Sequence, residues 1–434
     1  MATTADTTEE VFQSKYTGQQ IESLLDAVKE LSASAGRDYE LYCYRKCTLD
    51  SNPYSRVYYE EDNKYYRPAG MDFVKDEFSY GDWGNAFFTK VKPVMLNYDG
   101  TVAYELNPND YTKKKNGEDS DIADTSFKGN AMVGIPTVYV KRETIGVWEY
   151  VYISNKKIDD TYYAYAHTDA NGNIIDYLYF PIYNGTIVDG VLRSISDLAP
   201  TSSTTATTEI DAALKNNPSG ENIWYTNVLA DRQLINDLLI LMGKATNCQE
   251  IYGYGHYTGG SSASSFIKSG TMNQKGLFWG TNTSGKGVKV FGIENYWGNR
   301  WDRIAGYMYV SNTIKVKLTY GLQDGSTVMG YNKDGTGYVE LPNSTIGGSS
   351  GGYISKGYTN KYGFFPKTVS GNASAYECDG CWFANGTMYA LVGGSCYNGL
   401  LVGPLCVSLD HAASDSYWDV GASCSCKPKK VISN

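Results

Sequence analysis

The sequence carries no excess of positive charge. It contains 38 Lys and Arg residues against 47 Asp and Glu residues, so the formal net charge is −9 at pH 7. Proteins that bind DNA or RNA neutralise phosphates with a basic patch or stripe, and no such stripe is present. We therefore expect no nucleic-acid partner.

Long apolar runs and an export signal are also missing. No segment approaches the roughly 18 consecutive apolar residues of a membrane-spanning helix, so we expect no membrane insertion. The first ten residues, MATTADTTEE, are acidic and lack the apolar core of a secretory signal. We expect synthesis in a cytoplasm and, if the protein acts outside the cell, transport there as part of an assembled particle.

Residues for catalysis are sparse. The three histidines, His167, His256 and His411, have no spacing that suggests a metal triad or a base beside a nucleophile. The segment from Asp169 to Asn173 partly matches a calcium loop but lacks the downstream bidentate glutamate. Paired carboxylates occur in polar loops, without apolar flanks that would raise a pKa, so no glycosidase-type acid and base are visible.

The cysteines do not suggest a disulfide framework. Their number is nine, which is odd, and a protein made in a cytoplasm keeps its thiols reduced. Cys378 and Cys381 form a CxxC pair that could be redox-active or half of a zinc site, but a second pair at suitable spacing is missing. We predict that the protein is not an enzyme and has no catalytic residues, cofactor or metal.

Tyrosine is abundant, with 39 residues beside 46 glycines. Tyrosine offers a large, rigid contact area with a polar tip, and it therefore recurs on recognition surfaces. Tyrosine is also favoured in β-strands, so the composition fits either a binding protein or simply a β-rich one. The apolar fraction of 42% and the charged fraction of 20% are ordinary for a folded protein.

The first 36 residues predict a helix that joins chains together. Apolar residues recur at helical or heptad spacing within a helix over about 17–33, and they are Ile21, Leu24, Leu25, Val28 and Leu31. So narrow a stripe, with no following helix, is most simply buried against copies of itself, and we expect a homotrimer. The alternative is that the helix docks on the rest of its own subunit.

The remaining 398 positions read as mostly β, and the length of 434 residues suggests two or three units. Residues 37–81 are rich in tyrosine and alternate like short strands, which predicts a small β neck or the first strands of the next domain. Residues 82–434 show strand-like runs separated by turns such as Asp99-Gly100. One strongly apolar helix lies within 230–247, with Gly243 as its expected end.

One segment resembles a known fold family. Residues 292–301, GIENYWGNRW, resemble the signature of C-type-lectin folds of the sulfatase-modifying-factor type, in which a tryptophan packs beneath the binding loops. From the residues themselves, Trp297 and Trp301 are expected in the core, and Gly298 permits close approach of the backbone. The resemblance extends over roughly 82–434 and implies a C-type-lectin-like domain, which makes the predicted fold class α+β, mostly β.

The C-terminal part resembles the variable region of proteins diversified by a retroelement that mutates adenines. In residues 393–428 a framework of small residues, such as Gly393, Gly394 and Ser395, alternates with chemically unrelated side chains. Each of the latter is reachable from an asparagine codon by changes in its first two bases, although ordinary drift on a surface strand pair is an alternative explanation. These positions are Cys396, Tyr397, Leu400, Val402, Cys406, Ser408, Asp410, His411, Asp415, Tyr417, Asp419, Cys424 and Cys426.

The resemblance implies an adhesin of a bacteriophage. We predict a fibre or spike subunit on the virion surface that binds a host-surface receptor, protein or glycan, through the first eleven of these positions, with Trp418 of the framework adding aromatic area. Residues 1–36 would contact other virion proteins. The alternatives are a head-decorating fibre that adheres to mucus or host glycans, an enzyme (a formylglycine-type oxidase or a polysaccharide depolymerase), and a purely structural capsid or tail protein.

Overall fold

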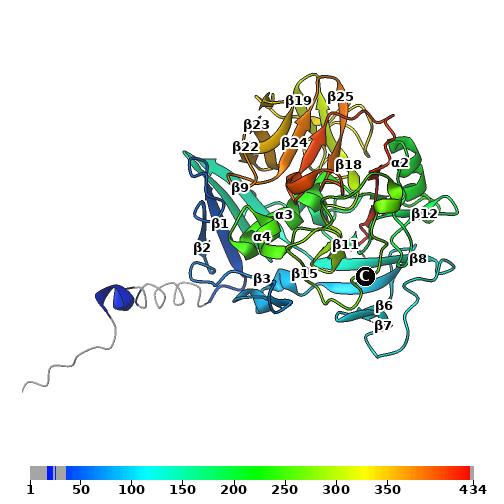
Figure 1. Ribbon diagram of the computed structural model, residues 1–434, viewed down its shortest axis with the longest axis horizontal. Coiled ribbons are helices and arrows are strands. Elements are labelled where there is room, and N and C mark those ends of the chain that lie inside the picture. Colours follow the sequence, from blue (N-terminus) through cyan, green and yellow to red (C-terminus); the bar gives the residue numbers. More distant parts are fainter. Residues whose placement is uncertain (1–16, 23–24, 26–35, 431–434) are drawn as a thin grey trace, which may run out of the picture.

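The computed structural model describes residues 17–22, 25 and 36–430. Strands make up 34% of the chain and helices 12%, which confirms the predicted class of α+β, mostly β. Three large sheets account for most strands, and the longest buried helix lies between them (Figure 1). None of the helices in the described ranges combines the length and apolarity needed to span a bilayer.

The first large sheet is antiparallel and has the strand order β2-β1-β10-β9. Its strands are β1 Leu41–Cys47, β2 Val57–Glu61, β9 Tyr139–Ile145 and β10 Trp148–Ser154. All seven residues of β1 pair with β10. The tyrosine-rich segment is therefore strand-forming, as its alternation predicts.

The predicted boundary at residue 81 does not divide the molecule. Strand β1 lies within the 37–81 segment, but its partner β10 comes from the other side of that boundary. Tyr44 Oη donates a hydrogen bond to Asp237 at 3.0 Å, and Tyr59 Oη donates one to the carbonyl of Leu241 at 2.6 Å. Residues 37–81 thus belong to the same core as the following chain instead of forming a separate neck, because their apolar faces need long-range partners for burial.

The second large sheet has seven strands in the order β14-β28-β11-β8-β5-β6-β7. They are β5 Lys92–Asn97, β6 Val102–Asn107, β7 Asp110–Lys114, β8 Gly129–Pro136, β11 Tyr177–Pro181, β14 Trp224–Thr226 and β28 Cys424–Cys426. The predicted turn between β5 and β6 is present, with Gly100 at φ +82°. Strand β28 inserts between β14 and β11, so the C-terminal segment is held in the middle of the fold.

The third and largest sheet has ten strands in the order β20-β19-β18-β25-β26-β24-β22-β23-β21, with β27 paired to β18. Its strands are β18 Trp301–Val310, β19 Thr313–Val316, β20 Val339–Glu340, β21 Gly347–Gly348, β22 Gly351–Asn360, β23 Gly363–Val369, β24 Gly380–Phe383, β25 Thr387–Val392, β26 Val407–Leu409 and β27 Val420–Gly421. Strand β26 runs parallel to β24, and β27 runs parallel to β18.

Short strands, 3-10 turns and α-helices make up the rest of the described secondary structure. The short strands are β3 Gly70–Asp72, β4 Glu77–Ser79, β12 Thr186–Val188, β13 Val191–Arg193, β15 Trp279–Gly280, β16 Val288–Val290 and β17 Ile293–Glu294. The 3-10 turns are η1 Trp83–Asn85, η2 Phe87–Thr89, η3 Tyr165–His167, η4 Ala263–Ser265 and η5 Gly399–Leu401. The α-helices are α2 Ala206–Leu214, α3 Leu229–Gly243 and α4 Cys248–Tyr252.

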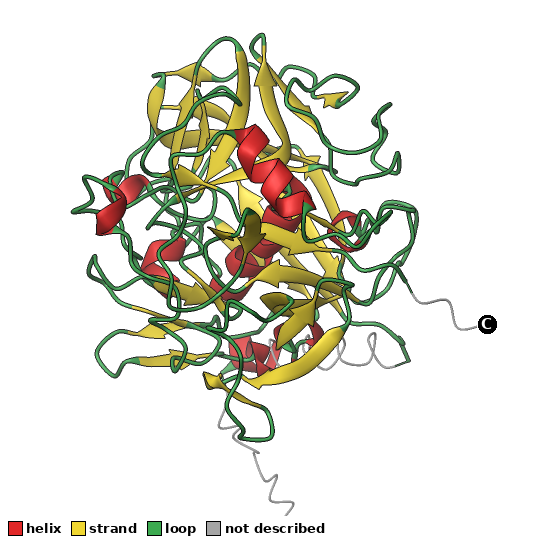
Figure 2. Cartoon of the chain, turned by 90° about the vertical axis from the view of Figure 1, so that its right-hand side faces the viewer, coloured by secondary structure: helices red, strands yellow, loops and turns green. Residues whose placement is uncertain are grey.

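Helix α3 is the centre of the fold. All of its 15 residues are buried, as expected for a helix that is apolar on much of its circumference. Its acidic residues are paired: Asp237 with Arg142 at 2.5 Å, and Asp231 with Lys427 at 3.0 Å. The helix ends at Gly243 as predicted, and the following residue, Lys244, takes the left-handed conformation at φ +52°. Figure 2 shows the helical segments lying among the strands and not as a separate layer.

The predicted N-terminal helix is described only in part. Thr17 caps residues 18–22: its Oγ1 accepts a hydrogen bond from the backbone of Gln20, and Gln20 Oε1 accepts one from the backbone of Thr17. Ile21 and Leu25 are 37% and 54% exposed, and this part of the helix lies apart from the three sheets (Figure 1). The other residues predicted to oligomerise, Leu24, Val28 and Leu31, lie outside the described residues.

The segment before β18 has the packing expected from its sequence. Trp297 and Trp301 are 0% and 5% exposed, and Trp297 Nε1 donates a hydrogen bond to the carbonyl of Gly253 at 3.2 Å. Gly298 has φ +72°, and a Cβ atom there would lie only 2.7 Å from the carbonyl oxygen of His256. Both tryptophans are therefore core residues, and Gly298 permits close backbone approach, as predicted.

Candidate ligand-binding site

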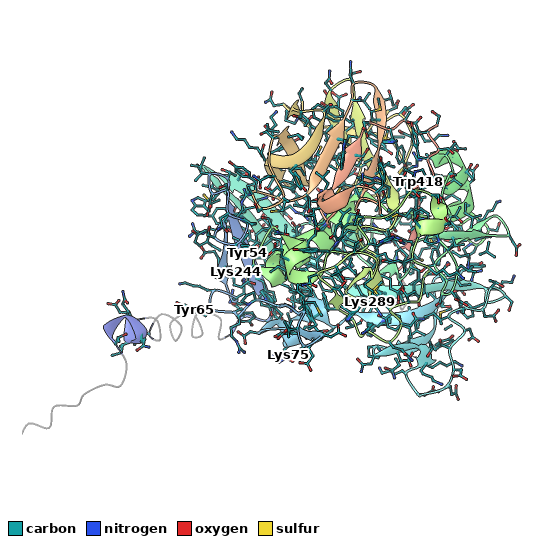
Figure 3. All side chains as sticks on the ribbon, viewed as in Figure 1. Tyr54, Tyr65, Lys75, Lys244, Lys289 and Trp418 are labelled. Carbon is teal, nitrogen blue, oxygen red and sulfur yellow. The ribbon has the colours of Figure 1, made fainter. Side chains whose placement is uncertain are left out.

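A pocket of about 280 Å³ opens beside the largest sheet. Strands β18, β24, β26 and β27 and the loops at 393–400 and 410–420 contribute its walls. Its lining consists of Trp301, Trp382, Tyr397, Asn398, Ser408, Asp410, His411, Tyr417, Trp418, Asp419 and Val420. Trp418 marks the pocket in Figure 3, on the side of the molecule that carries α2.

Two tryptophans from strands β18 and β24, which are separated in the sheet by β25 and β26, line the inner part of the pocket. Trp301 begins β18 and Trp382 lies in β24, and their ring centroids are 5.7 Å apart at an interplanar angle of 83°. Trp301 also packs with Leu391, Cys406 and Val420 in a small buried cluster. This part of the site is therefore built into the sheet, which makes it rigid.

The loop after β25 presents the most exposed ring. Gly393 and Gly394 turn the chain with φ values of +85° and +79°. Ser395 then holds the two loops together, because its Oγ lies 2.9 Å from Asn398 Oδ1 and 2.8 Å from Asp419 Oδ2. The result is that Tyr397 is 71% exposed, with its ring edge-on to Trp418 at 6.4 Å.

The loop at 410–420 is tied to the scaffold by its backbone. The amide of Trp301 donates to the carbonyl of Asp419 at 2.9 Å, and Arg303 Nη2 donates to the carbonyl of Asp415 at 2.9 Å. The carboxylate of Asp415 accepts a hydrogen bond from the amide of Ala412 at 2.9 Å. These bonds use main-chain atoms or a local turn, so the loop does not depend on the side chain of Tyr417. The ring of Tyr417 is 49% exposed.

Ser408, Asp410 and His411 form a hydrogen-bonded group in the wall of the pocket. His411 Nδ1 lies 2.7 Å from Asp410 Oδ1 and 3.0 Å from Ser408 Oγ, and the Ser408 hydroxyl also donates to Asp410 Oδ1. Burial raises the pKa of Asp410, but the hydrogen bonds from His411 and Ser408 lower it more, so the pKa of this carboxyl is held below its ordinary value.

This group does not have the geometry of a hydrolase triad. In a Ser–His–Asp triad the two ring nitrogens face opposite partners, with serine at Nε2 and aspartate at Nδ1. Here both Ser408 and Asp410 face the same nitrogen, Nδ1, of His411. Ser408 and Asp410 therefore share one ring nitrogen, and the arrangement orients the Asp410 carboxylate by two hydrogen bonds.

The structure brings six of the eleven predicted ligand-binding residues to this pocket. They are Tyr397, Ser408, Asp410, His411, Tyr417 and Asp419. Leu400 is 38% exposed and Asp415 is half-buried, but neither lines the pocket. Six of the eleven predicted positions therefore share one surface pocket.

The other predicted positions are buried, and this corrects their assignment. Cys396, Val402 and Cys406 are 0% exposed, so they cannot contact a ligand at the surface. Cys424 and Cys426 are equally buried, in strand β28. These small apolar side chains pack inward, and Cys406 supports the floor of the pocket beneath Trp301.

Trp382 and Val420 line the pocket without having been singled out by the sequence. Trp301 was expected in the core, where it is, but one side of its ring also faces the pocket. Trp382 directly follows Cys381 in β24, and the two alternate across the strand. That alternation was the signal that could have placed Trp382 on the open face, because Cys381 is buried.

The cysteines show no reactive arrangement in the described residues. All nine are free, and eight of them are buried. Burial raises the pKa of the Cys424 thiol to about 12 and that of Cys396 to about 11, and the pKa values of Cys378 and Cys381 are raised as well, so burial favours the protonated form of all four thiols. No group of three or more His, Cys, Asp or Glu residues in the described part of the chain could hold a metal ion.

A second surface pocket of about 230 Å³ lies at the end of the seven-stranded sheet. It is lined partly by Tyr177, Tyr179 and Lys429, and it contains none of the predicted ligand-binding residues. The pocket that contains Tyr397 and Trp418 is therefore the stronger candidate of the two for a ligand-binding site.

No protein-family model matches the sequence, and no curated protein is significantly similar to it.

Proposed function

We propose that the protein is a virion-surface adhesin of a bacteriophage that binds a host-surface receptor through the pocket around Trp418. One observation carries this proposal. Six positions that the sequence pattern marks as interchangeable are spread along the chain from Tyr397 to Asp419. All six line one pocket. A binding protein whose specificity varies needs this arrangement, in which variable side chains share a surface and a rigid scaffold supports them.

The finer fold class is part of the proposal. We take residues 82–434, together with the strands contributed by 37–81, to be a C-type-lectin-like domain. The burial of Trp297 and the close backbone contact at Gly298 support this, because both are features of the segment that resembles the lectin signature. The largest sheet would then carry the binding loops, as the pocket at β18, β24 and β26 suggests.

Attachment to the virion is assigned to residues 1–36. Ile21 and Leu25 expose apolar side chains on a capped helix, which would be buried in a homotrimer or against another virion protein. Several identical sites on one particle raise the overall affinity, because later contacts are effectively intramolecular. A pocket of modest size can therefore support firm adhesion without any chemical step.

The test is binding of the fluorescently labelled full-length protein to a panel of bacterial cells. Tyr397→Ala removes an exposed pocket ring, and Tyr65→Ala, at 47% exposure on the opposite side of the molecule, is the matched control (Figure 3). On cells that bind the wild type, we expect Tyr397→Ala to weaken binding by roughly tenfold, a typical loss for an aromatic residue central to an interface. Equal binding by Tyr397→Ala, Tyr65→Ala and the wild type would refute the adhesin proposal.

A further inference from the structure

The pocket around Trp418 is acidic and holds no basic side chain among its lining residues other than His411. Its carboxylates are Asp410 and Asp419. Asp410 uses only Oδ1 for Ser408 and His411, and Asp419 uses only Oδ2 for Ser395. Within the described residues the second oxygen of each carboxylate accepts no hydrogen bond, Asp419 forms no ion pair, and the ion-pair partner of Asp410 is His411, at its other oxygen. Their negative charge is therefore available to a ligand.

Aromatic rings enclose the same space at right angles to one another. Trp301 and Trp382 meet at 83°, Tyr397 and Trp418 meet at 80°, and Tyr417 meets the ring of His411 at 85° with centroids 5.0 Å apart. Rings from all three pairs line the same pocket, so a group inside it lies close to several aromatic side chains. The face of an aromatic ring is negative and attracts a cation.

We infer that this pocket binds a quaternary ammonium group, such as the choline head group, on the receptor. This inference rests on the proposed function, because it names the chemistry that the adhesin recognises. A quaternary ammonium is weakly hydrated and has an apolar surface, so it can leave water, pack against the rings and remain close to both carboxylates. The volume of about 280 Å³ is near the lower limit of small-molecule sites, so the pocket accommodates a compact group.

Other ligand chemistries fit the pocket less well. An anionic ligand would face Asp410 and Asp419 with no lysine or arginine in the lining to balance them. An uncharged ligand such as a sugar can donate hydrogen bonds to the two carboxylates, but it leaves their negative charge unbalanced. A primary ammonium can also pair with the carboxylates, but it is more strongly hydrated and gains less from packing against the rings than a quaternary ammonium does.

The experiment is a calorimetric titration of the full-length protein with choline and with its uncharged isostere 3,3-dimethyl-1-butanol. Both have the same shape, so the difference in affinity measures the effect of the charge. We expect choline to bind at least tenfold more tightly than the isostere and than ethanolamine. Phosphocholine and Nε-trimethyl-lysine in further titrations distinguish a choline-bearing glycan or lipid from a methylated protein as the source of the group.

Variants connect the measured affinity to the pocket. Tyr417→Leu removes a half-exposed ring, and Asp419→Asn removes charge while keeping an acceptor for Ser395, so each should lower choline affinity at least tenfold. The control is Asp160→Asn, whose side chain is 98% exposed outside the pocket and which should leave the affinity unchanged. Thermal unfolding of each variant verifies that it is folded.

The two proposals fail in different ways. If the isostere or ethanolamine binds as tightly as choline, or if choline does not bind, the ligand assignment is wrong, whereas a loss of cell binding in Tyr397→Ala still supports the adhesin. If choline binds in the pocket but Tyr397→Ala attaches to cells like the wild type, the ammonium site stands and the adhesin proposal is wrong.

Discussion

Buried histidine sets part of the pH response of this protein. His167 is 0% exposed, and its Nε2 lies 3.1 Å from the carbonyl oxygen of Ile135. Burial lowers the pKa of His167 to about 3, because the interior disfavours the charged ring. In the unfolded chain the same histidine takes up a proton near pH 6.5. Below that pH, the chain must therefore release the proton from His167 in order to fold.

The consequence is a loss of stability in acid. As the pH falls from about 6.5 toward 3, the unfolded state binds a proton that the folded state does not, which lowers the free energy of unfolding by roughly 1.4 kcal/mol per pH unit. We expect His167→Gln to remove this contribution, so that its free energy of unfolding changes less steeply with pH than that of the wild type. Urea unfolding between pH 7.5 and pH 4 measures both slopes, and parallel slopes would show that His167 does not titrate in this way.

Between elements, one turn depends on a glycine for two separate reasons. Gly298, which lies between β17 and β18, has φ +72° and sits against the backbone of His256. Gly285 offers a matched comparison, because it has φ +85° but has nothing within 4 Å of the position of a Cβ atom. Left-handed backbone costs most residues about 1–2 kcal/mol, so both glycines carry that penalty when replaced.

The pair separates conformational strain from steric contact. We expect Gly285→Ala to lower the free energy of unfolding by about 1 kcal/mol through strain alone. Gly298→Ala should lower it by clearly more, because the added Cβ would stand 2.7 Å from the carbonyl oxygen of His256. Chemical denaturation of the two variants tests this, and equal losses would mean that the turn can shift to accommodate the methyl group.

At the scale of the whole molecule, the exposed N-terminal helix is the feature that would join subunits. Leu25 is 54% exposed, and Gln19 lies on a different side of the same capped helix. In the proposed homotrimer, we expect Leu25→Asp to separate the subunits, because a charge would have to be buried in the helix interface, whereas Gln19→Asp should leave the trimer intact. Sedimentation of the full-length variants gives the masses. An unchanged mass for Leu25→Asp would place the subunit contacts elsewhere.

Local patterns were sufficient for several parts of this protein. The apolar surface of 230–247 predicts the buried helix α3 and its end at Gly243, and the alternation in 37–81 predicts strands. The spacing of Trp297, Gly298 and Trp301 predicts a packed turn. These features depend on the periodicity of neighbouring residues, which the chain order contains directly. The grouping of Tyr397, Asp410 and Tyr417 as surface residues also came from the sequence pattern.

Other features were decided only by contacts between distant segments. Strand β1 finds its partner in β10, about a hundred residues later, so residues 37–81 join the common core and do not form a neck. Cys396, Val402 and Cys406 lie in or beside irregular loops, where no repeat determines which side chains face inward, and they are buried. Trp382 reaches the pocket because β24 packs beside β26. The order of residues thus determines helices, strands and turns, whereas the faces of the loops and the walls of the pocket follow from which strands pair, since burial depends on long-range neighbours.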